Sequence, residues 1–289
     1  AVFRTVLILG IAYIILFPVL SKLSSSFMSK RDLIDQTVRY VPKHPTWDNY
    51  RFAMEVMNFW RVFTNSLLLS VVVATLQLAS STLVGYGLAR FEFRGRNLIL
   101  AAAIFTLVVP PQMMMVPLYL NWRFFNIYGL LPGQGLNLLN SPWPFILTAI
   151  TGTGLRNGLF ILVMRQFFTG IPRSLEEAAY VDGAGPLRTF IQVMLPSAVP
   201  SMVVVFLFGF VWQWNDSLLT TLYLDHNFLP VALSNITTRL AQYFEMTDPQ
   251  YFSFMVNAGS MLMIAPLLIM YTVLQRYFVE SIERTGLVG

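Results

Sequence analysis

Two charged residues fall inside hydrophobic stretches of this 289-residue chain and are its first candidates for chemistry. Arg156, with Asn157 beside it, lies near the middle of the stretch 143–168, and Asp216 ends the polar run 213–216 inside another. An arginine near mid-membrane costs about 2.5–3.5 kcal/mol on insertion scales and usually faces a partner or a water-filled path. Arg156 therefore predicts either a snorkelling or ion-paired side chain, with Asp216 or a second chain as partner, or a polar path that holds an anionic solute.

Catalytic and metal-binding sets are not expected. The sequence has no cysteine, which excludes disulfides, thiolate metal sites and thiol catalysis. It contains no H-E-x-x-H, G-x-S-x-G or G-x-x-x-x-G-K-[ST] pattern. His44 and His226 have no companions at ligand spacing, so we expect no catalytic residue, no metal site and no ATP-binding loop in this chain.

The composition is that of a polytopic membrane protein. The chain is 56% hydrophobic and 11% charged, with a mean hydropathy of +0.62, whereas soluble domains carry about 25% charged residues. In a soluble chain the net charge of +5 would suggest nucleic acid. Here the positive charge is attributed to membrane topology, so we expect the chain to contact membrane lipid and not nucleic acid.

Six stretches are long and apolar enough to cross a membrane as helices, which takes roughly 17–25 residues. They lie at about 5–21, 63–89, 98–120, 143–168, 196–223 and 251–274. Pro110-Pro111 predicts a kink or local unwinding in the third stretch. The predicted fold is therefore all-α, a single transmembrane domain over residues 1–289 with six spans.

Between the fourth and fifth spans lies a charged segment that predicts a short helix outside the lipid. Ser174 and Glu177 have the spacing of a capping box, and Glu176 and Glu177 favour the positive end of the helix dipole. Ala178 and Ala179 would leave a bare surface that another protein can approach closely. Gly183 can end this helix, and a new one can follow.

The same segment carries a resemblance to a known family. Glu177-Ala178-Ala179, three residues, Gly183, nine residues, Val193, one residue and Leu195-Pro196 is similar to the EAA loop of ABC-importer permeases, and only Val193 departs from it by replacing Ile. Further stretches resemble carbohydrate-importer permeases of the MalG type, namely 42–50, 86–96, 214–216 and 275–279.

The resemblance implies a permease subunit of a binding-protein-dependent oligosaccharide importer. Its partners would be a second permease, two ATP-binding subunits that hold ATP and Mg, and an external solute-binding protein, with no cofactor in this chain. The loop 171–195 would be the cytoplasmic coupling loop that enters a cleft of the ATPase. The residues assigned to this coupling are Ser174, Glu176, Glu177, Ala178, Ala179, Asp182, Gly183, Leu195 and Pro196.

A substrate path is expected around the polar residues of the spans. The candidates are Arg156, Asn157, Gln213, Trp214, Asn215 and Asp216. Arg156 and the basic loop at 24–61 are compatible with an acidic oligosaccharide such as alginate. A docking face for an acidic binding protein explains the basic loop equally well.

The sequence leaves alternatives open for the orientation of the chain in the membrane and for the energy source of transport. The positive-inside count is undecided, but the arginines of the tight turn 90–96 favour its cytoplasmic placement, with both termini cytoplasmic in a bacterial inner membrane. The rival class is an ion-coupled secondary transporter. Such a carrier usually needs titratable acids in its spans, and only Asp216 qualifies.

Overall fold

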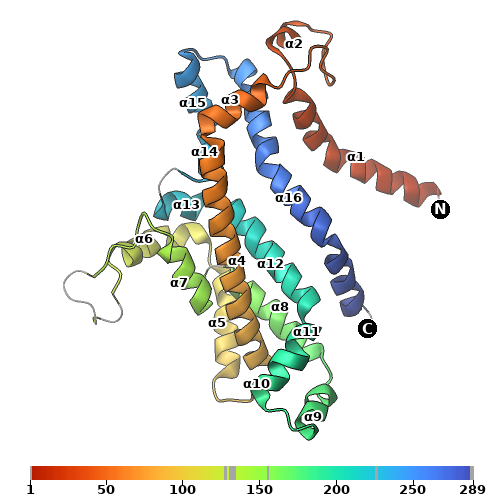
Figure 1. Cartoon of the computed structure of the whole chain (residues 1–289), viewed down its shortest axis with the longest axis vertical. Coiled ribbons are helices and arrows are strands. Elements are labelled where there is room, and N and C mark those ends of the chain that lie inside the picture. The colour runs from red at the N-terminus through yellow and green to blue at the C-terminus, as the bar shows by residue number, and fades with distance from the viewer. Residues whose placement is uncertain (1, 127–128, 130–134, 155, 225–226, 287–289) are drawn as a thin grey trace. The chain divides into compact units, whose positions relative to one another are not determined.

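The computed structural model describes residues 2–126, 129, 135–154, 156–224 and 227–286, so His226 lies outside the described residues (Figure 1). Within those ranges the regular elements are helices, accompanied by one isolated antiparallel bridge between Phe125 and Leu136. The prediction of an all-α fold is confirmed. Contacts divide the chain into two compact units, and helices α4 (Phe59–Arg90) and α16 (Pro249–Gly286) contribute residues to both.

Unit 1 comprises Ala1–Ser66 and His226–Met270. Helix α3 packs on α14 and α15, around a core that includes the fully buried Met57, Leu240 and Met255. Helix α1 is apolar enough to cross a membrane but has no buried residue. Besides parts of α4 and α16, the helices of this unit are α1 (Val2–Ser25), α2 (Lys30–Ile34), α3 (Asp48–Met57), α14 (Leu229–Ser234) and α15 (Ile236–Phe244).

Asp32 holds together the polar loop between α1 and α3. Its enclosed carboxylate accepts hydrogen bonds from the backbone N–H of Ser29 at 3.1 Å and of His44 at 3.2 Å, and it faces the His44 ring nitrogen Nδ1 at 3.1 Å. Burial by itself raises the pKa of Asp32, but the hydrogen bonds from Ser29 and His44 together outweigh it, so the pKa lies below its usual value. His44 thus has a structural contact in this loop.

This arrangement predicts that the loop loses order in acid. A lowered pKa means that the carboxylate stabilises the loop fully above pH about 4, the unfolded value, and that this contribution disappears as the pH falls through the folded pKa. Amide hydrogen exchange of residues 29–46, corrected for intrinsic rates, should rise below pH 4. Asp32→Asn should raise it already at pH 7 and flatten its pH dependence, and unchanged exchange in that variant would contradict the role of Asp32.

Unit 2 comprises Leu67–Asp225 and Tyr271–Gly289. Figure 1 shows α9 and α10 at one end of this unit and α6, α7 and α13 at its other end. Besides parts of α4 and α16, its helices are α5 (Arg96–Val108), the 3-10 helix η1 (Pro111–Met114), α6 (Met115–Arg123), α7 (Trp143–Thr151), α8 (Asn157–Gly170), α9 (Ser174–Val181), α10 (Pro186–Thr189), the π-helix η2 (Phe190–Met194), α11 (Leu195–Ser197), α12 (Val199–Trp214) and α13 (Leu218–Tyr223).

Several expected spans are broken helices. Within the described residues, α1, α4 and residues 249–276 of α16 could cross a membrane unbroken, and two bent pairs, 96–123 and 186–214, raise that number to five. The first pair bends by 100° after Val108, which confirms the break expected at Pro110-Pro111. The expected fourth span consists of two shorter helices, α7 and α8. The count of six spans therefore stays a prediction.

Glycines let three helices of unit 2 approach one another closely. A Cβ on Gly85 of α4 would lie 2.7 Å from Cβ of Met164 and 2.9 Å from the backbone nitrogen of Arg165, both in α8. A Cβ on Gly158 of α8 would collide with the Ala103 carbonyl of α5. Small residues at such crossings are how membrane helices gain packing contacts.

The packing predicts opposite outcomes for two neighbouring glycines of α4. Gly85→Ala should destabilise the protein by about 1–3 kcal/mol because the neighbouring atoms are backbone and Cβ and cannot move aside cheaply. Gly87, whose added Cβ would meet nothing within 4 Å, is the matched control. Gly87→Ala should be neutral or stabilising by up to about 1 kcal/mol. Thermal unfolding in detergent compares the two, and equal shifts would contradict close packing at Gly85.

Candidate functional site

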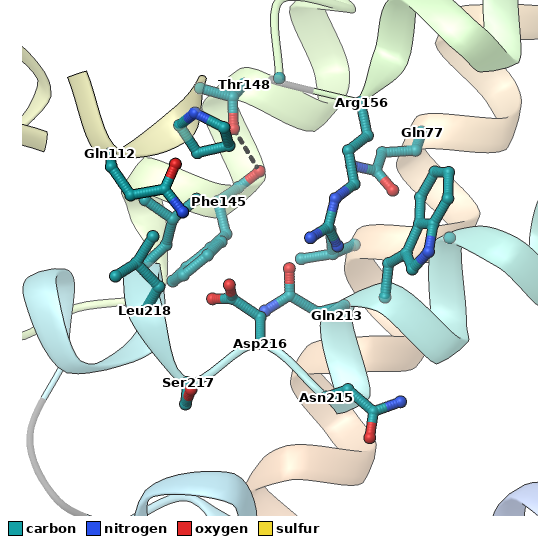
Figure 2. A pocket seen from close by; sticks show the side chains of 16 residues that line it. Gln77, Gln112, Phe145, Thr148, Arg156, Gln213, Asn215, Asp216, Ser217 and Leu218 are labelled. Carbon is teal, nitrogen blue, oxygen red and sulfur yellow. Dashed lines mark hydrogen bonds between the residues drawn. The ribbon is translucent and has the colours of Figure 1, made fainter. Parts of the chain in front are cut away.

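Three interruptions of the helices in unit 2 meet at one pocket of about 350 Å³. They are the break before η1, residues 152–154 and 156 between α7 and α8, and residues 215–217 between α12 and α13. Ligand pockets commonly have volumes of about 300–1,000 Å³. The polar lining residues are Gln77, Gln112, Thr148, Arg156, Gln213, Asn215, Asp216 and Ser217 (Figure 2).

The local sequence explains why the helices stop at the pocket. Pro110 and Pro111 lack the N–H that would continue α5, and Gly152 ends α7 with a positive φ of 69°. Within a membrane, irregular backbone is tolerated only where it is buried in protein or lines a water-filled cavity. The convergence of the three breaks is therefore typical of a polar cavity.

Arg156 lies at the break and not inside a helix, because α7 ends at Thr151 and Arg156 is the N-cap of α8. Its side chain is exposed, and its guanidinium lies 4.9 Å from the ring centroid of Trp212. Among the described residues, no ion pair within 4.0 Å joins Arg156 to Asp216. Among the alternatives that the sequence left open, the ion pair with Asp216 is not formed, and Arg156 instead lines the pocket with an aromatic neighbour.

Asp216 supports the neighbouring helix α13. Its Oδ2 accepts hydrogen bonds from the backbone N–H of Thr220 at 2.9 Å and from the Thr220 hydroxyl at 3.1 Å. Figure 2 shows the Asp216 carboxylate and the Arg156 guanidinium directed into the same space. A solute in this pocket would therefore meet groups of both charges.

Two of the expected path residues do not line the pocket. Asn157 is fully buried and donates a hydrogen bond to the Ser80 hydroxyl at 3.4 Å. Trp214 is 0% exposed and stacks on Phe210 with ring centroids 5.6 Å apart. Burial against neighbouring helices, which the run 213–216 does not reveal, removes both side chains from the cavity wall.

Two further polar residues line the pocket that the sequence had not suggested. Gln77 is the one amide side chain in residues 66–90 of α4, and Gln112 directly follows the proline pair, so both carried a detectable signal. Gln213 was expected and lines the pocket, and its buried Nε2 has no hydrogen-bond partner among the described residues. Buried polar atoms are rarely left unpaired, so this amide is suited to a water or a solute.

The charged segment after α8 forms helix α9 (Ser174–Val181), but the expected capping box is wrong. The helix begins one residue earlier than predicted, with Arg173 as N-cap in helical conformation (φ −62°) and its carbonyl accepting from the backbone N–H of Glu176 at 3.0 Å. Ser174 is thus already helical and cannot act as the cap, since a capping side chain needs an extended backbone.

The end of α9 agrees with the prediction. Asp182 is the C-cap, Gly183 adopts a left-handed φ of 81°, and the backbone N–H of Ala184 donates to the Ala179 carbonyl at 2.9 Å. Pro186 then opens α10. Glycine takes the left-handed region without the Cβ clash that other residues suffer, which explains the sharp turn at this position.

The residues expected to couple to an ATPase separate into an outward and an inward group. Glu177 and Ala178 are exposed and Ala179 is partly exposed, so they form a free face of α9. Glu176 is buried and contacts Arg90 and Tyr86 of α4. Figure 1 places α9 at the tip of this end of unit 2.

Leu195 and Pro196 belong to a bent helical segment that the sequence did not predict. The π-helix η2 directly precedes α11, and the axis turns by 74° before α12 begins at Val199. Pro196 removes the hydrogen bond to the Gln192 carbonyl, so the neighbouring turn has to rearrange. Single-turn π segments are frequent at functional sites of helices.

Comparison with known proteins agrees with this architecture. The chain is 31% identical to a diacetylchitobiose uptake system permease protein of Streptomyces coelicolor (94% of this chain, 83% of the relative). It is 28% identical to an arabinooligosaccharides transport system permease protein of Halalkalibacterium halodurans (96% and 93%). It shares the fold of a chain from a bacterial ABC transporter involved in the import of the acidic polysaccharide alginate, with a TM-score of 0.77, 23% identity and coverage of 96% and 95%.

The match to a family description decides the assignment. Residues 81–284, which include the pocket residues of α7, α12 and α13, Arg156 and the helix α9, match the family of binding-protein-dependent transport system inner membrane components. The broken apolar helices and the polar pocket are features that a multi-pass membrane permease requires. The chain belongs to the family of inner-membrane permease components of binding-protein-dependent ABC importers.

Proposed function

We propose that this chain forms half of the translocation path of an oligosaccharide importer and couples ATP hydrolysis to alternating access. The observation that carries the proposal is that α4, α8 and α12 reach both the pocket and the α9 end of unit 2. Gln77 in the middle of α4, Arg156 at the N-cap of α8 and Gln213 near the end of α12 line the pocket, and segments of the same helices nearer to α9 meet in one hydrophobic core. A displacement at α9 would therefore be transmitted to the pocket by whole helices.

The exposed face of α9 is the proposed docking surface for an ATP-binding subunit. Two such subunits, which would hold ATP and Mg, are expected beneath this chain and a second, related permease, with a solute-binding protein on the opposite side. This arrangement implies that α9 and both termini are cytoplasmic. Small side chains at 178 and 179 would allow close contact, and the carboxylate of Glu177 is available to a basic group of the ATPase.

An acidic oligosaccharide is the proposed substrate, with alginate-derived chains as one example. The pocket offers a guanidinium, several amides and two hydroxyl side chains, which suit carboxylate and hydroxyl groups of a uronate, while the carboxylate of Asp216 is already engaged by Thr220. The tryptophan that lines the pocket, Trp212, has its ring face occupied by the Arg156 guanidinium. Similarity to the alginate transporter supports the fold, while the substrate class rests on the chemistry of this pocket.

The docking surface predicts a loss of stimulated ATP hydrolysis. In the reconstituted complex, Glu177→Ala should reduce the hydrolysis stimulated by solute-binding protein and substrate by about tenfold, as expected for one central interface residue. Glu55→Ala, which alters an exposed carboxylate of α3 in unit 1, is the control and should have no effect. Full stimulation in Glu177→Ala, or uptake that survives ATP depletion in an ion gradient, would count against this function and favour a secondary carrier.

The pocket predicts charge-selective uptake. Arg156→Gln should lower uptake of a uronate oligosaccharide by about 10- to 100-fold, the range for losing a hydrogen bond to a charged group, while a neutral oligosaccharide should be unaffected. Arg123→Gln, which changes an exposed arginine of α6, is the matched control. If Arg156→Gln reduces uptake of charged and neutral sugars equally, Arg156 has a structural role only.

A further inference from the structure

We infer that Glu176, Arg90 and Tyr86 form a buried latch that fixes α9 to the end of α4, so that Glu176 positions the coupling helix and does not dock the ATPase. This inference rests on the proposed function of α9. The three residues lie in unit 2 and belong to two helices separated by more than eighty residues of sequence.

Glu176 differs from its neighbour Glu177 in burial. It is 8% exposed and is the buried residue of α9, whereas Glu177 is exposed. A carboxylate is seldom buried without charged or hydrogen-bonding partners. The position of Glu176 therefore calls for partners inside the chain, and α4 supplies them.

The partners hold the carboxylate at both oxygens. The Tyr86 hydroxyl donates to Oε1 of Glu176 at 3.0 Å, and Nε of Arg90 lies 3.2 Å from Oε2. The Arg90 side chain is 7% exposed, and its Nη2 also donates to the Ile171 carbonyl at 2.7 Å. One guanidinium thus holds both α9 and the connection that leads into it from α8.

The contact between Arg90 and Glu176 is an ion pair and not a well-aligned hydrogen bond. Its buried Nε has no hydrogen bond of good geometry among the described residues, although it stands within ion-pair distance of Glu176. The two charges would face each other in a poorly hydrated site, where an unpaired partner is strongly disfavoured. A partial displacement of α9 from α4 would break the ion pair and the Tyr86 hydrogen bond and leave a buried charge without its partner, which favours movement of the two helices as one body.

Tyr86 extends the latch into the core of this end of the unit. Its ring contacts Phe168 of α8 at 5.3 Å and Phe190 of η2 at 4.6 Å between centroids. These rings belong to the hydrophobic cluster that also includes Met164 and Met194. A push on α9 is thereby delivered to α4, α8 and the π-helix together.

A nearby ion pair provides the contrast. Arg173 Nη2 lies 3.8 Å from Glu92 Oε1, but their side chains are 67% and 80% exposed. Exposed pairs of this kind contribute little to stability. Glu92→Gln is thus a matched control, because it removes a carboxylate from the same end of the molecule without touching the latch.

The test combines a distance measurement with a coupling measurement. Because this chain has no cysteine, Leu83→Cys on α4 and Val181→Cys on α9 can carry two spin labels in a reconstituted complex whose other subunits are cysteine-free. The distance distribution should be narrow, and equally narrow with and without ATP. Glu176→Gln should broaden it and lower the substrate transported per ATP hydrolysed by roughly fivefold or more, the lower range of site-to-site coupling, whereas Glu92→Gln should change neither quantity.

Two further variants distinguish loss of the latch from misfolding of Glu176→Gln. Tyr86→Phe removes one hydroxyl and should produce the same changes at smaller size. The exchange Arg90→Glu with Glu176→Arg should lie closer to the wild type than either single change, which a merely space-filling role would not produce. An unbroadened distribution in both Glu176→Gln and Tyr86→Phe overturns the latch. If substrate does not change the ATP hydrolysis rate of the unmodified complex, the proposed function is contradicted. The distance distribution between the two spin labels still tests the latch in that case.

Discussion

The hydrocarbon interior of a membrane offers no water to backbone N–H and C=O groups, so a chain that crosses it must satisfy these groups internally. Unbroken helices do so, and α4 is such a helix over 32 residues. Three interruptions of the helices in unit 2, after Val108, between α7 and α8 and at 215–217, face one pocket. The polar site therefore exists where irregular backbone from three places converges, so that polar side chains and solvent can satisfy it.

Helices α4, α5 and α8 of unit 2 pack closely against one another. Gly85 and Gly158 bring α4, α8 and α5 into backbone contact, and Phe160 and Met164 fill the remaining space. Close-packed interiors transmit displacement because they cannot absorb it. The pocket and α9 are thus connected by closely packed helices, which suits the proposed transmission of a movement of α9 to the pocket.

Charge is used differently at the two ends. At the pocket, Arg156 is exposed and covers Trp212, so its guanidinium can meet a solute without losing an ion-pair partner. At the α9 end, Arg90 is enclosed with Glu176, and removing one member of such a pair typically costs about 3–5 kcal/mol. An exposed charge can exchange partners, while an enclosed pair stays together and maintains geometry.

The sequence by itself determined the class of the fold, the family and the limits of several helices. Hydropathy located the long apolar helices α1, α4 and α16, Pro110-Pro111 marked a break, Gly183 marked the end of α9, and the spacing from Glu177 to Pro196 carried the family resemblance. These features are local, because a proline lacks an amide hydrogen and a glycine tolerates a positive φ in any context.

Only the tertiary structure decided which of the candidate side chains act together. It moved Asn157 and Trp214 away from the pocket wall, added Gln77 and Gln112, and turned Glu176 toward α4 while Glu177 stayed outside. Adjacent residues of a helix point about 100° apart, so Glu176 and Glu177 look alike in sequence until a second helix covers one of them. The reason is physical: burial and partnership depend on contacts between segments far apart along the chain, and local sequence patterns do not contain them.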